Sequence, residues 1–352
     1  MVRFYSPRFL LDMKDRNNDV PEIFLSMGNR TSGKTFGIGN EVLIPGFIKE
    51  GKKFALLVRW QRELGNAAEG VFKAVLEEKY PEYMIKEQVM GKGVYSNLYL
   101  VHKEGEDFVE EHCGYVLPIN NATPNIKPIS SIFSDVEIMF MDEFQTTKYC
   151  PNEVSEFISL HTSVARGKGK AVRYVPVILC SNAIDIANPY FISLKILRQL
   201  QPDTKKLRGE GWVLEIFVNT DVQKEQEASA FNRAFADEKA VKSSINNMWL
   251  LGNSSCICKP DTSWGRSVYY CTIQDEDTKY GVRFYPQVGI YYINYSVDVD
   301  CKYKYNISLD GELNVPLLKT SNMIKILRES FAKGSVRMTD PKVKEMVLKT
   351  FV

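Results

Sequence analysis

The stretch Gly28-Asn-Arg-Thr-Ser-Gly-Lys-Thr35 limits the possible folds most, because it fills every position of the phosphate-binding pattern G-x-x-x-x-G-K-[ST]. It follows Ile23-Phe-Leu-Ser-Met27, an apolar run typical of a buried strand. In such a loop the backbone N–H groups surround a phosphate, Lys34 reaches the β- and γ-phosphates, and Thr35 ligates Mg²⁺. The sequence therefore predicts a nucleotide site. Its expected residues are Gly28, Asn29, Arg30, Thr31, Ser32, Gly33, Lys34 and Thr35.

A second apolar run, from Ile138 to Met141, leads directly into Asp142 and Glu143. The carboxyl ends of strands in an open α/β sheet are where ligands bind. We expect Asp142 to hold Mg²⁺ and Glu143 to act as the general base on an attacking water. Alone, such an acidic pair fits a solvated turn, but together with the phosphate loop it indicates hydrolysis of a nucleoside triphosphate. No N-K-x-D guanine motif is present, which favours ATP over GTP.

Two further side chains are candidates for the reaction. Asn182 follows the predicted strand Val172–Cys180, where its amide is placed to sense the γ-phosphate or orient the water; a simple turn-forming role fits equally well. Arg166 ends a helix predicted from Pro151. Its guanidinium either complements the helix dipole or enters a neighbouring subunit's site as an arginine finger.

The remaining patterns predict an α/β fold, a P-loop NTPase core of the additional-strand (RecA/FtsK-like) type over residues 1–218. We expect the following elements in it: a helix from Phe36 to about Lys49 that Pro45 and Gly46 bend or end, a strand at Phe54–Val58, a helix around Val71–Leu76, hairpins or a meander within 83–117, a loop at 118–131 and a strand at Trp212–Val218.

The composition changes after residue 218. Residues 219–248 are rich in helix formers, with a helix expected from Lys224 to about Asn246, and are predicted to be a helical linker. Residues 249–352 are predicted to form a small α+β domain of three meander strands followed by helices near 320–333 and 341–351.

Composition also narrows the class of protein. A chain of 352 residues with 44% hydrophobic content can bury a large core. It has no run of about 18 apolar residues and no secretory h-region, so we expect a soluble intracellular protein that makes no membrane contact. Its seven cysteines lack paired metal-binding spacing and are expected to be reduced thiols. With a net charge of +2, any nucleic-acid contact requires a local basic patch or charges gathered by oligomerisation.

Several motifs together resemble the small genome-packaging ATPases of Picovirinae-type phages, which are more distantly related to large terminase subunits. The motifs are Gly28–Thr35 with its Arg30, Leu57-Val-Arg59, Phe140-Met-Asp-Glu-Phe144, Ser181-Asn-Ala183 and Asn188-Pro-Tyr-Phe191. The resemblance implies a homopentameric ring on the portal vertex of a prohead in the host cytoplasm, which translocates double-stranded DNA inward with ATP and Mg²⁺. It also implies contacts with the portal or a packaging RNA, and a vestigial ribonuclease-H-like C-terminal domain without cleavage activity.

The same resemblance implies roles for three basic residues. Arg166 resembles the family's trans-acting arginine finger, Lys127 a lysine that acts across the subunit interface, and Arg62 a basic residue facing the ring lumen. Because translocation of any sequence requires contacts to phosphates, exposed cations are the expected DNA ligands. The candidates are Arg59, Arg62, Lys86 and Lys92. Arg59, at a predicted strand end, lies near either the pore or the nucleotide.

Two other functions fit the sequence. One is a viral helicase or replication ATPase. The other is a nucleotide-gated assembly scaffold, in which the loop binds ATP to order a ring. Arg30, which the loop pattern does not require, either fixes the loop or is solvated.

Overall fold

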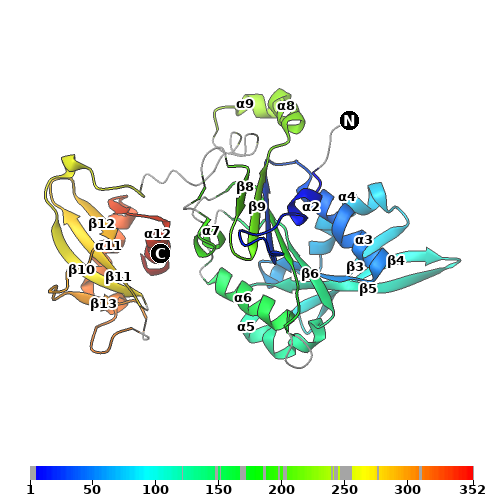
Figure 1. The fold of residues 1–352 in the computed structure, drawn as a ribbon, viewed down its shortest axis with the longest axis horizontal. Coiled ribbons are helices and arrows are strands. Elements are labelled where there is room, and N and C mark those ends of the chain that lie inside the picture. The colour runs from blue at the N-terminus through cyan, green and yellow to red at the C-terminus, as the bar shows by residue number, and fades with distance from the viewer. Residues whose placement is uncertain are drawn as a thin grey trace. The chain divides into compact units, whose positions relative to one another are not determined.

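Two compact units, residues 1–251 and 252–352, make up the chain (Figure 1). The computed structural model describes residues 5–120, 122–146, 150, 152–166, 172–184, 188–196, 199–200, 204–238, 241, 245, 256–275, 277–308 and 311–351. Within this part of the chain, no helix is both long and apolar enough to cross a membrane.

The first unit is built on a nine-stranded sheet of order β3-β4-β5-β2-β6-β7-β1-β9-β8. Its parallel strands are β1 (Ile23–Gly28), β2 (Lys53–Val58), β5 (Asp107–Pro118), β6 (Val136–Met141), β7 (Val177–Ser181) and β9 (Trp212–Phe217). The antiparallel strands are β3 (Tyr83–Met90), β4 (Tyr95–Glu104) and β8 (Lys206–Arg208). Because β7 lies between β1 and the acidic strand β6, the sheet confirms the predicted additional-strand architecture.

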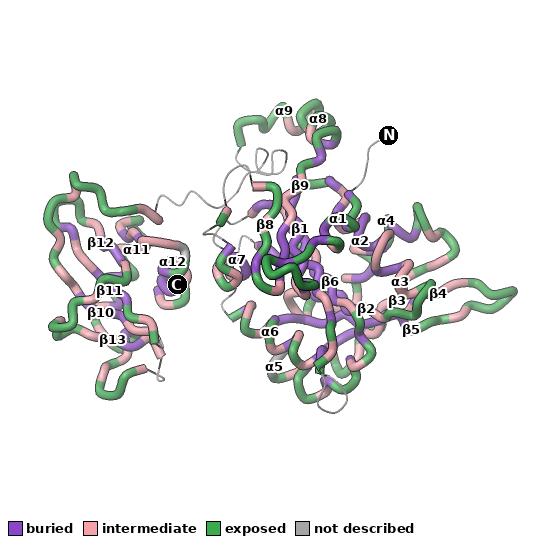
Figure 2. Tube along the Cα trace, in the orientation of Figure 1, coloured by how far each residue is buried: buried purple, intermediate pink, exposed green. Residues whose placement is uncertain are grey.

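Both faces of the central strands are buried, as Figure 2 shows. Alternate residues of a strand point to opposite faces, so Leu25 and Met27 join one apolar cluster and Phe24 joins the other. The first face is covered by α6 (Glu153–Val164) and α7 (Pro189–Ser193). The second is covered by the helices between β1 and β3. Because the strands are packed on both faces, the positions of the residues at their carboxyl ends are fixed.

The helix after the phosphate loop is longer than predicted. It runs through α2 (Lys34–Ile38), a π-helical turn (Gly39–Leu43) and α3 (Ile44–Glu50), and ends at Gly51 with a φ of 68°. The expectation that Pro45 and Gly46 end it at that point is wrong, whereas the alternative that they bend it stays a prediction. Pro45 lies in the first turn of α3, where a missing N–H costs little. The next predicted helix is α4 (Ala67–Lys79).

The meander predicted within 83–117 is confirmed as β3, β4 and β5, but it extends the main sheet because β5 pairs with β2 in parallel. At Gly114, a Cβ would lie 1.9 Å from the carbonyl oxygen of Phe54, so this pairing requires glycine. The loop predicted at 118–131 is wrong. That segment contains α5 (Ala122–Asn125) and η3 (Lys127–Phe133), whose Phe133 is buried in the core.

Other boundaries shift by a few residues. The strand predicted from Val172 begins only at Val177, directly after Pro176, which has no N–H for a ladder. The helix predicted from Pro151 begins at Glu153, and Pro151 itself lies outside the described residues. The helix expected from Lys224 begins earlier, as α8 (Thr220–Ala228), and is followed by α9 (Ala230–Ala234). Most of the predicted linker from 239 to 248 lies outside the described residues.

The second unit contains the predicted meander and helices. Strands β10 (Val268–Asp275), β11 (Thr278–Tyr285) and β12 (Ile290–Asn294) are antiparallel. The elements added to them are β13 (Lys304–Asn306) parallel to β10, β14 (Val336–Met338) parallel to β12, and the helices α11 (Asn322–Ala332) and α12 (Pro341–Phe351). Among the described residues, the other short helices are α1 (Arg8–Leu11), η2 (Gln61–Glu63), η5 (Thr262–Trp264) and η6 (Leu318–Thr320).

Three acidic residues of the second unit serve local structure. Asp261 caps η5, Asp275 forms an ion pair with Lys349 at 3.3 Å, and Asp298 accepts a hydrogen bond from the backbone of Asp300. Among the described residues, no group of three or more histidine, cysteine or acidic side chains is placed to hold a metal ion. The ribonuclease-H-like and vestigial description of this unit stays a prediction.

Candidate nucleotide site

Three neighbouring strands bring the predicted site residues together. The phosphate loop follows β1, Asp142 and Glu143 follow β6, and Asn182 follows β7. The loop is shaped by left-handed residues, with φ values of 63° at Thr31 and 84° at Gly33. A cavity of about 470 Å³ opens at this edge, lined by residues 30–36 together with Asp142, Glu143 and Asn182. The geometry therefore forms one site from three separated sequence motifs.

A further wall of the cavity was not predicted. It comes from α4, where Gly70, Val71 and Ala74 line the cavity. Gly70 and Ala74 are four residues apart and so lie on the same side of the helix. The signal in the sequence was the pair of small residues at that spacing. This wall is apolar and leaves space beside the loop.

Lys34 is folded back over the loop. Its Nζ donates hydrogen bonds to the carbonyl oxygens of Gly28 and Asn29 at 3.2 and 3.1 Å. It also donates to Ser32 Oγ at 3.1 Å and Asn182 Oδ1 at 3.2 Å. Burial lowers the pKa of Lys34, and the nearby Asp142 and Glu143 oppose that shift. The ammonium group is thus held where an anionic phosphate would meet it.

The two predicted Mg²⁺ ligands lie side by side, since Thr35 Oγ1 donates to Asp142 Oδ2 at 2.8 Å. Burial raises the pKa of Asp142, while Thr35 and Lys34 act in the opposite direction. A hydroxyl and a carboxylate beside a phosphate loop are the oxygen ligands that Mg²⁺ uses when substrate phosphates and water complete its shell. The donor set therefore fits Mg²⁺.

Glu143 lies on a strained turn. Its φ is 58°, an uncommon conformation for a residue with a side chain. Its Oε1 accepts a hydrogen bond from Asn182 Nδ2 at 3.4 Å. Burial and the neighbouring Asp142 raise the pKa of Glu143, and Arg30 and Lys34 lower it. Arg30 is exposed at the cavity wall, so it influences this carboxylate from across the site.

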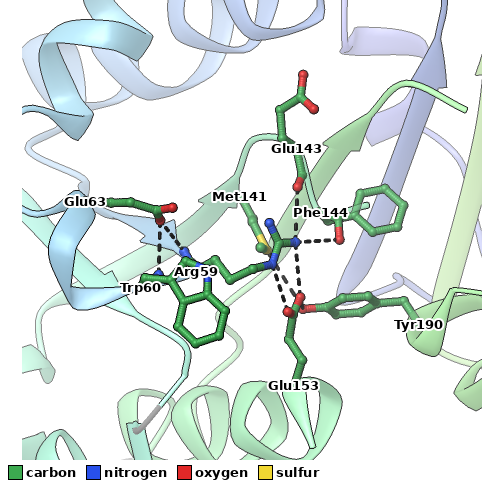
Figure 3. A network of polar contacts seen from close by, with 8 residues as sticks. All are labelled: Arg59, Trp60, Glu63, Met141, Glu143, Phe144, Glu153 and Tyr190. Atoms are coloured by element: carbon green, nitrogen blue, oxygen red, sulfur yellow. Dashed lines mark hydrogen bonds and ion pairs between the residues drawn. The ribbon is translucent and has the colours of Figure 1, made fainter. Parts of the chain in front are cut away.

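The turn at Glu143 is held from behind by Arg59, at the end of β2 (Figure 3). Arg59 Nη2 donates to the carbonyl oxygens of Glu143 at 3.2 Å and Phe144 at 2.9 Å. Its Nε donates to Glu153 Oε2 at 2.8 Å, with Nη2 on Glu153 Oε1 at 3.2 Å. The side chain of Arg59 is only 12% exposed. These contacts hold the guanidinium group inside the protein, which argues against Arg59 as a DNA contact.

Glu153 and Tyr190 complete this network; Tyr190 lies in the Asn188-Pro-Tyr-Phe191 motif, but neither residue was predicted to belong to the site. Glu153, in the first turn of α6, is 3% exposed and also accepts a hydrogen bond from Tyr190 OH at 3.2 Å. Glu63 accepts hydrogen bonds from the backbone N–H groups of Arg59 and Trp60 (Figure 3). The Arg59 backbone and side chain are both fixed, so the position of Glu143 is fixed with them.

The other basic candidates lie on the surface. Arg166, just after α6, is exposed and forms a β-bridge with Val172, while residues 167–171 lie outside the described part. Lys127 is exposed on η3, and Arg62 is exposed with its guanidinium 5.8 Å from the Trp60 ring centre. Among the described residues that line the cavity, neither Arg166 nor Lys127 occurs.

Two lysines of the β3–β4–β5 meander differ in their surroundings. Lys92 is exposed in the turn between β3 and β4, with a φ of 57°. Lys86 Nζ forms an ion pair with Glu110 at 2.7 Å, so its charge already has a partner within the protein. Lys92 is therefore the better candidate for a phosphate contact.

Replacing Asn182 tests whether it contributes to the reaction or only forms a turn. In Asn182→Ala, Lys34 loses one acceptor and Glu143 loses its amide donor. We expect ATP turnover to fall about tenfold to a hundredfold with little change in ATP affinity, because a water-orienting contact acts in the transition state. Steady-state ATP hydrolysis measures this. An unchanged kcat would indicate the turn role alone.

The chain is similar in sequence and in fold to known proteins. Residues 2–352 match the profile of a family described as podovirus DNA encapsidation protein (Gp16). The DNA packaging proteins of Bacillus phages phi29 and PZA are each 24% identical over 362 residues, covering 99% of this chain and 97% of theirs. A solved structure of the bacteriophage Phi-29 viral genome packaging motor assembly is similar, with a TM-score of 0.61 and 21% identity, covering 99% of this chain and 98% of that one. The last comparison shows a shared fold.

Proposed function

The chain belongs to the podovirus DNA encapsidation protein (Gp16) family, and from this premise we propose that it is an ATP-driven motor that moves double-stranded DNA into a preformed prohead. One observation carries the ATPase part of the proposal, the 2.8 Å hydrogen bond between Thr35 and Asp142 beside Glu143. It supports the proposal because the phosphate loop and the acidic strand end, 107 residues apart, meet at a single cavity.

In the proposed reaction the loop backbone and Lys34 bind the triphosphate. Mg²⁺, held by Thr35 and Asp142, would neutralise charge developing on the β- and γ-phosphates. Glu143 takes a proton from the attacking water, and a raised pKa makes its carboxylate a stronger base. Asn182, bonded to both Lys34 and Glu143, orients that water. The apolar wall from α4 offers a surface for the adenine ring.

Arg166 is proposed to complete the site of the next subunit in a homopentameric ring, with Lys127 assisting across the same interface. Its exposure and its absence from the described lining of its own cavity support action in trans. A guanidinium is suited to charge on a transferring phosphoryl group.

Mixed rings test this assignment. Arg166→Ala and Lys34→Ala subunits should each hydrolyse almost no ATP alone. In an equal mixture, about a quarter of interfaces combine an intact loop with an intact finger, so about a quarter of wild-type turnover should return. As a control, Arg166→Ala is mixed with the Lys34→Ala/Arg166→Ala double variant, which restores no interface. Assembled mixed rings that stay inactive would count against the finger.

For DNA, we propose that Arg62 and Lys92 contact backbone phosphates. Both are exposed, and a ring would repeat each around the duplex. Changing both to glutamine should weaken DNA binding uniformly across sequences and reduce the salt dependence of binding by about one to two phosphate contacts per bound subunit. Binding titrations at several salt concentrations measure this. The control is Lys86→Gln, since Lys86 is already paired with Glu110. An equal loss in the control would refute the assignment.

Residues 219–248 are proposed to be a helical linker that joins the ATPase domain, 1–218, to a C-terminal domain, 249–352, that docks on the portal, the prohead or a packaging RNA. Asp261, Asp275 and Asp298 are engaged locally, and no group of three or more described histidine, cysteine or acidic side chains is placed to hold a metal ion, which supports docking over nuclease chemistry. We place the protein at the portal vertex in the host cytoplasm during packaging.

Reconstituted packaging tests the function. Purified protein, empty proheads, double-stranded DNA and ATP should yield DNA protected from nuclease, with ATP turnover stimulated by DNA and proheads together. Strand displacement without proheads would favour the alternative of a viral helicase or replication ATPase. Packaging that continues when only a non-hydrolysable ATP analogue is supplied would favour the assembly scaffold.

A further inference from the structure

The segment that follows β9 touches the back of the phosphate loop. Strands β1 and β9 pair in parallel up to Gly28 and Phe217. A Cβ on Gly28 would lie 2.6 Å from the carbonyl oxygen of Phe217, so the two backbones are in direct contact there. The loop is therefore bordered by the nucleotide cavity on one side and by the chain leading into α8 on the other.

Asn29 continues this pairing with its side chain. Its Nδ2 donates to the carbonyl oxygen of Asn219 at 3.2 Å, and its Oδ1 accepts from the Asn219 N–H at 3.0 Å. The two residues are 0% and 6% exposed, so this reciprocal pair is shielded from water. The Asn219 side chain caps α8 by accepting from the N–H groups of Asp221 and Val222. A phosphate-loop side chain thus fixes where α8 begins.

A second contact lies further along α8. Gln226 Nε2 donates to the carbonyl oxygen of Arg30 at 3.2 Å and to Thr31 Oγ1 at 3.0 Å. Arg30 and Thr31 also line the nucleotide cavity. Within the described structure, Gln226 Oε1 is buried without a hydrogen-bond partner. An unsatisfied acceptor is costly, so a loop arrangement that supplied a donor to it would be favoured.

We propose that Asn29, Asn219 and Gln226 couple the phosphate loop to α8, so that nucleotide binding stabilises this helix. The inference rests on the proposed ATP site. Asn219 and Gln226 are positioning residues, because they contact the loop and not the nucleotide. Coupling between two equilibria is reciprocal. The factor by which ATP stabilises α8 must therefore equal the factor by which the α8 contact tightens ATP binding.

Hydrogen exchange and calorimetry on the full chain test this equality. With a non-hydrolysable ATP analogue, exchange of the α8 backbone amides should slow about fivefold, the effect of one neutral hydrogen bond. Gln226→Met keeps the side-chain volume but cannot donate, so it should abolish that slowing and weaken analogue binding about fivefold. The matched control is Gln223→Met on the same helix, where Gln223 bonds Glu227. It should leave both values unchanged.

The outcomes separate this inference from the ATP site itself. If the analogue protects residues 28–35 while α8 exchange stays the same, the coupling is wrong and the site stands. If residues 28–35 gain no protection and no binding heat appears, the ATP site is wrong and the coupling with it. Should Gln226→Met melt α8, Gln226→Ala also lacks the donor, adds no charge beside the phosphate loop and has the best helix propensity. This variant must then lose both the slowing of α8 exchange and the fivefold in analogue affinity. If it keeps them, the proposal is wrong.

Discussion

Glu143→Gln is expected to lower ATP hydrolysis by about a thousandfold while ATP still binds, because the amide cannot take a proton from the attacking water. The main-chain support of the turn should persist, since Arg59 contacts the carbonyl oxygen of residue 143 and not its side chain. Packaging should stop completely. Single-turnover hydrolysis, nucleotide affinity and DNA protection are the three measurements.

The pH dependence provides a second readout for Glu143. Burial and Asp142 raise its pKa, so the active carboxylate is lost at a higher pH than for an ordinary glutamate as the solution is acidified. The acidic limb of the wild-type kcat/KM profile, which reports groups of the free enzyme, should lie at a higher pH for this reason and should disappear from the residual activity of Glu143→Gln. A control is Glu225→Gln on the exposed side of α8, which should match the wild type. Packaging that survives in Glu143→Gln with ATP bound would refute the motor.

The phosphate loop and both strand ends were predictable because each is a local pattern. An apolar run of strand length followed by glycines or acidic residues can be recognised within about ten consecutive residues. Parallel pairing then brings the ends of β1, β6 and β7 to one edge, as the predicted α/β class requires. The roles of Glu143, Asn182 and Arg166 stay predictions, because geometry places them without measuring what they do.

Other features depend on contacts distant in sequence. Pro45 reads as a helix end, yet the preceding π-helical turn carries the helix past it. Residues 118–131 read as a loop because of their prolines, although Phe133 just beyond them is anchored in the core. Arg59 was expected near either the pore or the nucleotide, and only the fold reveals Glu153, 94 residues later, as its partner. Pairing across such separations leaves no periodic signal in one sequence.

Removing one partner of the buried Arg59–Glu153 pair is expected to lower the free energy of unfolding far more than removing one partner of an exposed pair. Arg59→Met leaves the Glu153 carboxylate 3% exposed and without its cation. An unpaired buried charge of this kind costs about 3–5 kcal/mol. Chemical denaturation that follows the unfolding transition of the first unit measures this loss in the free energy of unfolding. The exposed pair Lys86–Glu110 is the control, because Lys86→Met should cost at most about 1 kcal/mol.

The double variant Arg59→Met/Glu153→Gln separates stability from positioning. It leaves no buried charge, and glutamine still accepts the hydrogen bond from Tyr190, so most of the lost stability should return. The carbonyl oxygens of Glu143 and Phe144 remain without their donor, however, and the left-handed turn is no longer held. ATP turnover should therefore stay at least about tenfold below the wild type although the protein is folded. Recovery of turnover together with stability would show that Arg59 holds the fold and not the catalytic turn.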